Sequence, residues 1–487
     1  MAHRTDRIER RGSRVRGRVL LACFGWAMMV PSWMVAGEAA VGRVADRAEL
    51  EKPLAVTAFI DVNVIPMDRE RVLCGQTVLV RGATILAVGP SDEVEVPRHA
   101  VQIDGSGRYL LPGLAEMHAH VPPREIPWEE FEEVLFLYLA NGITTARGML
   151  GHPLHLELRR RLAAGEMLGP RLFTSGPSLN GQSAPDPQTA REMVRAQREA
   201  GYDFLKLHPG LGRETFDALV ETAREVGIPF AGHVSADVGL PRTLEVSQAS
   251  VDHLDGYLET LVADGSDVEG LQPSFFGFHL VSHLDPAKIP GIAAATREAG
   301  VWNVPTQSLI EHVLSPDLSV EELAARPEMR YVAPETVEQW SRVKSNFLAN
   351  PGYDPERARR FIEVRRSLIG ALQEAGAGLL LGSDAPQIFN VPGFAIHHEM
   401  RMMQASGLTP YEVLLSGTRN VALFFGEEDR MGTVEVGKSA DLLLVEGNPL
   451  EDLGHLRSPA GVMARGFWLS GDDIRTGLEE IADRHAR

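Results

Sequence analysis

Two histidines one residue apart, His118 and His120, lie at the end of an apolar stretch, LLPGLAEMHAHV. Side chains two residues apart on a strand point to the same face. Three more titratable residues end later apolar stretches: His233 in IPFAGHV, His253 in SVDHLD and Asp384 in LLLGSD. Imidazole and carboxylate are common ligands of zinc-like ions, and burying a carboxylate is costly unless it is paired or bound to metal. Together these five residues predict a metal site, although a lone His-x-His pair would not.

The elements that must position these residues are short strands. Over residues 113–427, short apolar strands alternate with amphipathic helical stretches. This alternation implies βα units and a parallel sheet. The candidate strands are GLAEMHAHV, GITTAR, RLFTSG, DFLKLH, IPFAGHV, SVDHLD, VWNVPT and GLLLGSD.

From the end of the first candidate strand at residue 120 to the end of the eighth at residue 384, the chain has a length close to the roughly 250 residues typical of a (β/α)8 barrel. We therefore predict the α/β class and a (β/α)8 TIM barrel over 113–427, with a doubly wound sheet as the alternative. In a barrel the catalytic residues lie at the carboxyl ends of the strands. The histidines and the aspartate are therefore expected to meet there.

Two segments of β character flank this middle part. Short alternating strands separated by glycine-centred turns occupy residues 54–110, and the same texture returns in GTVEVGKSADLLLVEG. We expect residues 50–112 and 428–470 to pair into one small β-sandwich domain, followed by a helical tail over 471–487. Two long connections, 254–300 and 305–377, would lie on the catalytic face as lids or pocket walls.

A lysine, Lys206, ends the strand DFLKLH. Such a lysine can simply extend its amine to solvent. If it points inward, its charge is a problem, because a protonated amine cannot bind a metal and is repelled by dications. Something must then remove the charge.

With this lysine, the sequence resembles the amidohydrolase superfamily of metal-dependent hydrolases, in particular its imidazolonepropionase-like and Xaa-Pro-dipeptidase-like branch. The resemblance rests on LPGLAEMHAH, Lys206, His233, His253, GSDAP, GLTPYEVLLSGTRNVALFFG and GTVEVGKSADLLLVEGNPLEDL. It implies two divalent metal ions per chain, bridged by a CO2-derived carbamate on Lys206. By the same resemblance the ligands of the first metal are His118, His120 and Asp384, and those of the second are His233 and His253.

The chemistry of such a centre is hydrolysis. Two dications that share a water lower its pKa towards neutrality, and one of them polarises the scissile carbonyl. Asp384 would be both ligand and general base, passing the proton to the leaving nitrogen. We expect cleavage of amide or peptide C–N bonds, with dipeptides or N-acyl amino acids as substrates. Lys206 favours this over deamination or imidazolone opening, which the resemblance associates with one metal.

Some alternatives remain open at this point. The same centre would suit a cyclic amidase or a lactonase, because a fold does not determine a function. A non-catalytic metal-binding or sensory protein is the alternative of another class, and the presence of Asp384 in its expected place argues against it. Zinc is the expected metal, but nitrogen and oxygen ligands also suit manganese, iron or cobalt.

Four residues are candidate substrate contacts. His208 shares a face with Lys206, and Arg147 ends the second strand as the nearest cation for a substrate carboxylate. Tyr257 follows the sixth strand, and His398 follows the eighth after a loop.

Composition and the N-terminus set the context. The chain has 487 residues, 44% hydrophobic and 23% charged, and its net charge of −18 argues against a nucleic-acid partner. Residues 1–18 contain seven arginines, an uncharged run fills 19–37, and small residues follow, which predicts an export signal over 1–39. A retained anchor helix is the alternative, although Pro31 interrupts the run.

We expect a periplasmic or extracellular protein without stable membrane anchoring after cleavage. Its expected partner is a small amide or peptide substrate, and it can form a homo-oligomer. Of the two cysteines, Cys23 lies in the signal, so Cys74 would have no intramolecular disulfide partner in the mature chain.

Overall fold

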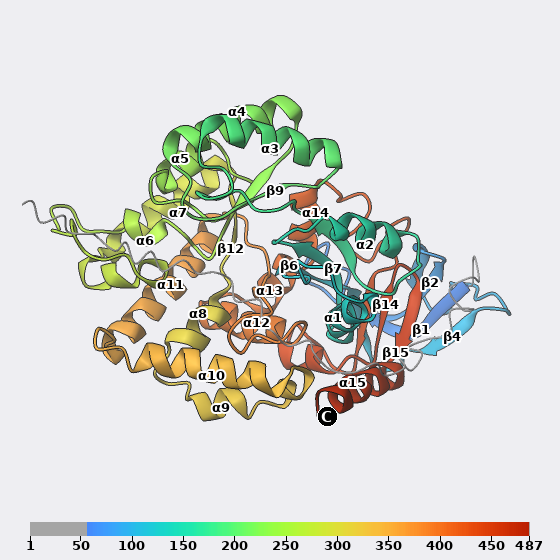
Figure 1. Cartoon of the computed structure of the whole chain (residues 1–487). Helices are drawn as coiled ribbons and strands as arrows, with labels where there is room; N and C mark the ends of the chain where they lie inside the picture. The colour runs from blue at the N-terminus through green and yellow to red at the C-terminus, as the bar shows by residue number, and fades with distance from the viewer. Residues whose placement is uncertain (1–55, 487) are drawn as a thin grey trace, which may run out of the picture.

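The computed structural model describes residues 56–486 (Figure 1). The predicted export signal, 1–39, lies outside the described residues, as do Cys23 and the first residues of the segment 50–112. None of the described helices combines the length and the apolar character needed to cross a bilayer.

The two flanking segments form one sheet, seen on the right of Figure 1. Among the described residues it has eight strands in the order β15-β14-β13-β5-β1-β2-β3, with β4 beside β1. The antiparallel pairing of β13 with β5 joins the C-terminal segment to the N-terminal one. These strands are β1 (Val56–Val64), β2 (Leu73–Arg81), β3 (Thr84–Pro90), β4 (Val101–Asp104), β5 (Tyr109–Pro112), β13 (Leu442–Val445), β14 (Gly461–Ala464) and β15 (Phe467–Ser470).

The middle of the chain supplies parallel strands. The described part contains two parallel sheets, β6-β7-β8 and β9-β10-β11-β12. Every residue of β6, β7, β9, β10 and β11 is buried, which is typical of parallel strands covered on both faces. The strands are β6 (Leu114–Ala119), β7 (Ile143–Gly148), β8 (Arg171–Thr174), β9 (Leu205–Leu207), β10 (Phe230–Gly232), β11 (Ser250–Asp252) and β12 (Trp302–Val304).

The helices α3 and α11 begin and end at recognisable capping residues. The Asp186 side chain accepts two backbone N–H bonds at the start of α3, and Asp354 does the same for α11. Gly201 and Gly376 end these helices in the left-handed conformation.

The helices are α1 (Trp128–Ala140), α2 (Leu154–Ala163), α3 (Pro187–Ala200), α4 (Arg213–Val226), α5 (Gly239–Glu245), α6 (Tyr257–Thr260), α7 (Ile289–Ala299), α8 (Gln307–Leu314), α9 (Val320–Ala324), α10 (Pro334–Leu348), α11 (Pro355–Ala375), α12 (Ala395–Ala405), α13 (Pro410–Ser416), α14 (Arg419–Phe425) and α15 (Gly471–His485), and the 3-10 helices are η1 (Phe275–His283), η2 (Pro286–Lys288), η3 (Pro327–Tyr331) and η4 (Leu453–Arg457).

The two long connections are helical. Residues 254–300 form α6, η1, η2 and α7, and residues 305–377 form α8 to α11 with η3. They share an apolar core of their own, which includes Phe278, Leu309 and Trp340. In Figure 1, α8, α9 and α10 lie below the centre of the molecule, and α3, α4 and α5 lie above it.

The eighth predicted strand, 378–384, is irregular, which corrects the sequence prediction. Its ladder to β12 is reduced to an isolated bridge between Leu379 and Asn303. On the other side, Met117 N donates to Leu381 O at 2.9 Å, while Leu381 N donates to Ser416 O. A Cβ on Gly382 would lie 2.8 Å from His118 N, so the segment fits only because this residue is glycine.

Candidate metal centre

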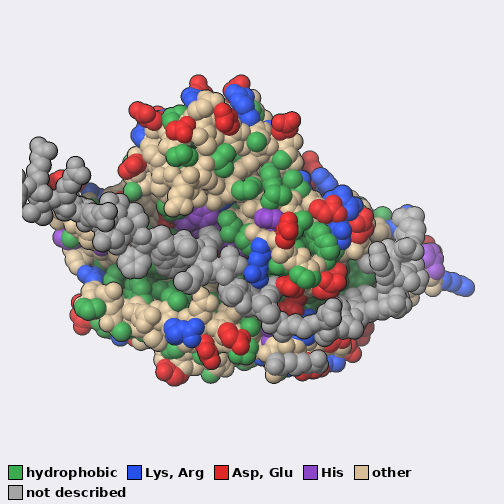
Figure 2. Space-filling view, viewed as in Figure 1, with side chains coloured by type: hydrophobic (Ala, Val, Ile, Leu, Met, Phe, Trp, Pro, Cys, Tyr) green, Lys and Arg blue, Asp and Glu red, His purple; other side chains and the backbone are tan. Residues whose placement is uncertain are grey.

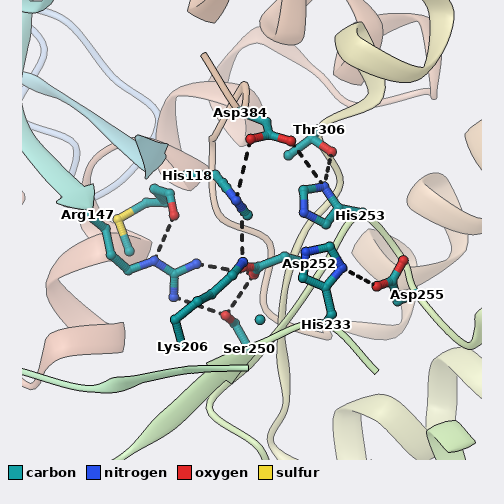
Figure 3. A network of polar contacts seen from close by, with 12 residues as sticks. His118, Arg147, Lys206, His233, Ser250, Asp252, His253, Asp255, Thr306 and Asp384 are labelled. Carbon is teal, nitrogen blue, oxygen red and sulfur yellow. Dashed lines mark hydrogen bonds and ion pairs between the residues drawn. The ribbon is translucent and has the colours of Figure 1, made fainter. Parts of the chain in front are cut away.

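Four predicted ligands converge at the carboxyl ends of the parallel strands (Figure 3). His118 lies in β6, while His233 and His253 directly follow β10 and β11. The imidazole centroid of His253 is 4.6 Å from those of both His118 and His233. One ligand atom from each of His118, His253 and Asp384 lies within 4.8 Å of the others. This trio could hold a metal ion.

The remaining predicted histidine also reaches this group. His120 Nε2 donates to Asp384 Oδ1 at 2.6 Å, and its ring centroid is 5.3 Å from that of His118. The trio of His118, His253 and Asp384 differs from the division implied by the resemblance, which assigned His253 to another metal than His118 and Asp384. The predicted ligands of the two metals therefore form one continuous cluster, in which His253 lies beside both His118 and His233.

Lys206 points into the same space. Its side chain in β9 is fully buried, and its Nζ has no hydrogen-bond partner among the described residues. The nearest carboxylate oxygen, Asp252 Oδ2, is 3.7 Å away. A Cβ on Gly232 would lie 2.9 Å from Lys206 Cδ, so the glycine in β10 makes room for the side chain. Burial lowers the pKa of Lys206 and so favours a neutral amine.

Beneath the histidines lies an ion pair that sequence reasoning missed. Arg147 Nη2 donates to Asp252 Oδ1 at 3.2 Å, and Ser250 Oγ donates to the same oxygen. Asp252 Oδ2 is 3.2 Å from His118 Nδ1. Burial alone would raise the pKa of Asp252, but Arg147 and Lys206 hold it below its usual value. The signal in SVDHLD was two polar residues, Ser250 and Asp252, sharing one face of a buried strand.

Two hydrogen bonds set the tautomers of the histidines after β10 and β11. Thr306 Oγ1 donates its own proton to Pro305 O, so it must accept the bond from His253 Nδ1 at 2.8 Å. His233 Nδ1 donates to Asp255 Oδ2 at 2.6 Å. Both imidazoles are thereby left with a free lone pair on Nε2, which is the arrangement that second-shell partners give to metal-binding histidines.

Glu116 is a further residue that sequence reasoning missed. It shares the period of two with His118 and His120, which was the available signal. Its Oε1 accepts bonds from His118 N at 2.9 Å and Ser383 N at 2.8 Å, and its Oε2 accepts one from Ser383 Oγ. Burial raises the pKa of Glu116 to about 7. The side chain joins β6 to the residue before Asp384.

The centre fits a divalent metal ion. Both ring nitrogens of His118, Lys206 Nζ and Asp252 Oδ2 are buried and lack a hydrogen-bond partner among the described residues. Buried polar atoms are almost always paired in folded proteins. Imidazole nitrogens and carboxylate oxygens are the donors that zinc, manganese, iron and cobalt accept.

Comparison with known proteins agrees with this geometry. A model of the amidohydrolase family matches residues 109–469, most of the chain. The chain belongs to the amidohydrolase family. It is therefore a hydrolase that acts on carbon–nitrogen bonds.

Individual relatives of this amidohydrolase are distant. It is 26% identical to an imidazolonepropionase of Symbiobacterium thermophilum over 420 residues, 77% of this chain and 84% of that protein. It is 29% identical to an ochratoxinase of Aspergillus niger over 449 residues, 84% of each. A solved structure of a putative prolidase from Bifidobacterium longum matches with a TM-score of 0.65 and 22% identity, covering 88% of this chain and all of that one. The fold is of the TIM-barrel type.

Three residues predicted to contact the substrate are buried and already bonded to other protein groups. Arg147 is fully buried, and each of its three guanidinium nitrogens donates a bond, to Met117 O, Ser250 Oγ and Asp252 Oδ1 respectively. The hydroxyl of Tyr257, also fully buried, bonds to Thr296 and Asn303. His398 is 2% exposed and bonds to Glu328 in the insertion. A substrate could meet these groups only by breaking protein hydrogen bonds, so strand-end position was a poor guide.

The fourth candidate, His208, remains a predicted substrate contact. Neither ring nitrogen has a hydrogen-bond partner among the described residues, and the ring stacks on that of His233 at 4.9 Å. Burial lowers the pKa of His208, which keeps the imidazole neutral. On the face drawn in Figure 2, histidine side chains reach the surface in a hollow between the upper and lower parts of the molecule.

Proposed function

We propose that this amidohydrolase hydrolyses the amide bond of dipeptides or N-acyl amino acids at a pair of divalent metal ions bridged by a carbamate on Lys206. The observation that carries the proposal is the Lys206 amine, fully buried without a hydrogen-bond partner among the described residues and surrounded by imidazoles and carboxylates. An ammonium group there would repel the metals that the histidines attract.

Carbamate formation removes this conflict. The ammonium first loses one proton. The neutral amine then attacks the carbon of CO2, a C–N bond forms as one C=O π bond opens, and a second proton leaves to solvent, so a cation becomes an anion. Burial favours the neutral amine that this step needs. The Arg147 guanidinium, bound to Asp252, compensates negative charge below the centre.

His118, His120 and Asp384 would hold one metal, His233 and His253 the other, with the Lys206 carbamate between them. When bound, such a pair activates a water and polarises the scissile carbonyl. Asp384 Oδ2 makes no hydrogen bond to a described residue and lies 3.8 Å from His253 Nδ1. This oxygen is the group that takes the proton from the water and delivers it to the leaving nitrogen.

Metal analysis tests the proposal. We expect about two metal ions per chain in the wild type, and loss of at least one in Lys206→Ala. The matched control is Lys344→Met, which alters another fully buried lysine, one that donates to His312 O and Ser315 O in the insertion. This variant should keep both metals. A wild-type count near one would contradict the bridged pair.

A substrate panel tests the reaction. Dipeptides and N-acyl amino acids should be cleaved, with activity lost on chelation and restored by added metal. Cleavage of hydantoins or lactones in their place would favour a cyclic amidase or lactonase. A metal-loaded protein that cleaves none of them would indicate the non-catalytic alternative.

We also propose that the two parallel sheets are parts of one closed eight-stranded barrel. In support, an isolated parallel bridge joins Ser175, which follows β8, to Phe204, which precedes β9. The segment 378–384 bonds to Asn303 on one side and to Met117 on the other. The flanking sheet would likewise curl into a sandwich. Phe59 of β1 contacts Trp468 of β15 with ring centroids 5.2 Å apart, although β1 and β15 are four positions apart in the sheet.

Export is the last part of the proposal, and it is supported by the sequence of residues 1–39 alone. N-terminal sequencing of protein secreted by a bacterial host would test it. A mature N-terminus near residues 37–40 is expected, and an intact N-terminus held in the membrane fraction would favour the retained anchor.

A further inference from the structure

A second fully buried arginine, Arg365, approaches the centre from the insertion 305–377. It lies on α11 and reaches the backbone that follows β11 and β12. Its Nη1 donates to His253 O at 2.9 Å, and its Nη2 donates to Pro305 O at 3.2 Å. Its Nε donates to the side chain of Gln307 at 2.9 Å. One side chain thus binds the ends of two neighbouring strands.

Both strand ends have an unfavourable backbone conformation. His253 has a φ of 61° and Thr306 a φ of 47°, in the left-handed region that costs non-glycine residues roughly 1–2 kcal/mol each. For a β-branched residue such as Thr306 this is a true outlier. Such conformations persist only where the surroundings hold them, and they are frequent at functional sites.

The guanidinium is connected to the imidazole of His253 by a chain of bonds. Pro305 O accepts from both Arg365 Nη2 and Thr306 Oγ1, and Thr306 Oγ1 accepts from His253 Nδ1. Arg365 therefore touches the backbone of His253 directly and the residue that sets its tautomer indirectly.

The acceptors of Arg365 are neutral, which distinguishes it from an ordinary buried ion pair. Among the described carboxylates, none lies within ion-pair distance of its guanidinium. Asp255, Glu399 and Glu311 act on it through space, and burial lowers the pKa of Arg365 to about 10. It therefore stays charged at neutral pH and uses that charge on backbone carbonyls.

We propose that Arg365 is a positioning residue for the metal ligand His253, holding the ends of β11 and β12 in the left-handed conformation that directs the imidazole to the metal. This gives the insertion a role as a support of the centre, in addition to any role as a wall. The inference rests on the metal centre of the proposed function.

Zinc affinity of the metal-free protein tests the proposal. Wild type, Arg365→Met, Arg365→Lys and Arg366→Met are titrated with Zn²⁺ against a chromogenic chelator, with the folded fraction measured by circular dichroism. Arg366, the neighbour on α11, binds Glu311 through both carboxylate oxygens and touches no backbone of the centre. It controls for the loss of a part-buried arginine ion pair on the same helix.

We expect Arg365→Met to weaken zinc binding by about 10–100-fold, the usual effect of losing an outer-shell partner. Arg365→Lys should recover part of the loss, because an ammonium can donate to both carbonyls but lacks the fixed fork. Arg366→Met should bind zinc as the wild type does. A folded Arg365→Met with wild-type affinity, or an equal loss in Arg366→Met, would overturn the proposal.

Arg365→Met could fail to fold, and Thr306→Val then decides. It removes the oxygen that accepts from His253 Nδ1 without altering Arg365. Wild-type zinc affinity in both Thr306→Val and Arg365→Lys would overturn the proposal, and weakened affinity in both would support it. A wild type that binds no zinc would remove the proposed function itself, whereas a zinc-binding wild type beside an equally tight Arg365→Met removes only the role of Arg365.

Discussion

The metal centre is supported by two buried arginines that do different things. Arg147, in strand β7, pairs with the carboxylate of Asp252, which in turn lies 3.2 Å from His118 Nδ1. Arg365, in helix α11, binds the backbone carbonyls of His253 and Pro305. The first places charge beneath the centre, and the second fixes the shape of the chain beside it.

The parallel strands therefore supply the charge balance of the centre, and the insertion supplies the support for its backbone. Arg147 and Asp252 both lie within the parallel strands, so the charge balance below the centre belongs to the βα framework. Arg365 comes from a connection between β12 and the segment 378–384. The positions of His253 and Thr306 therefore depend on a part of the chain that lies outside the sheets.

The largest expected effect concerns Asp384, the candidate general base, which neither arginine contacts. Asp384 contacts His120 at 2.6 Å on one side and lies 3.8 Å from His253 on the other. Asp384→Asn should lower kcat by about 10³-fold, since general acid–base catalysis by one group is worth 10²–10⁴-fold. Steady-state hydrolysis of a cleaved dipeptide measures this, with thermal unfolding as the check on folding. Full activity would show that Asp384 is not the general base.

The next effect is on the free energy of unfolding. It distinguishes the charge that Arg147 supplies to Asp252 from the backbone conformation that Arg365 holds. In metal-free protein, Arg147→Met leaves Asp252 as a buried charge and should lower the free energy of unfolding by about 3–5 kcal/mol. Arg365→Met leaves unpaired carbonyls and should cost about 1–3 kcal/mol. Chemical denaturation measures both. The double variant Arg147→Met/Asp252→Asn should recover part of the first loss, and no recovery would refute the charge role of Arg147.

The smallest expected effect is a pH dependence of stability caused by Glu399, which binds the backbone of the insertion. Glu399 accepts bonds from Gln307 N at 2.9 Å and Ser308 N at 2.7 Å, next to the partner of Arg365, and burial raises its pKa to about 7. Between pH 4.5 and 7 the folded protein then holds a proton that the unfolded chain has released. The free energy of unfolding should therefore fall as the pH rises through this window, by an amount on the order of 1–3 kcal/mol for this group.

Glu399→Gln removes that titration. Denaturation curves at pH 5 and pH 7 should show a smaller difference in the variant than in the wild type. Carboxyls that do not act on Glu399 contribute equally to both proteins, so the difference reports Glu399 together with its electrostatic coupling to Glu116. Parallel pH dependences would mean that Glu399 is already ionised in the folded protein at pH 5.

The sequence predicted the candidate ligands because their types recur at strand ends, and the structure brings His118, His253 and Asp384 together. It missed Asp252, although Ser250 and Asp252 are two polar residues on one face of a buried strand, because the neighbouring His253 already supplied the ligand type expected at that strand end. Arg365 was missed although a signal existed. Phe361, Arg365, Leu368 and Leu372 follow the helical period and are all buried, so the arginine stood on the apolar face of α11.

The parallel strands and main helices could be predicted from periodicity, whereas the eighth strand and the substrate contacts could not. Residues 378–384 have strand-like composition, but Gly382 fits against His118 N and Leu381 N bonds to Ser416 O. Tyr257 lies in the expected region, yet its hydroxyl bonds to Thr296 and Asn303. Which partner satisfies a polar group is a tertiary property that local sequence does not contain.

The pairing of β5 with β13 has a consequence for biosynthesis. Strands β1 to β5 emerge from the ribosome early, but β13, the partner of β5, is synthesised only near the end of translation. Until residues 442–470 emerge, β5 presents an open sheet edge, and such edges invite pairing with other chains. Chains interrupted before this point would keep that edge exposed, so aggregation would remove truncated products that already contain every proposed metal ligand.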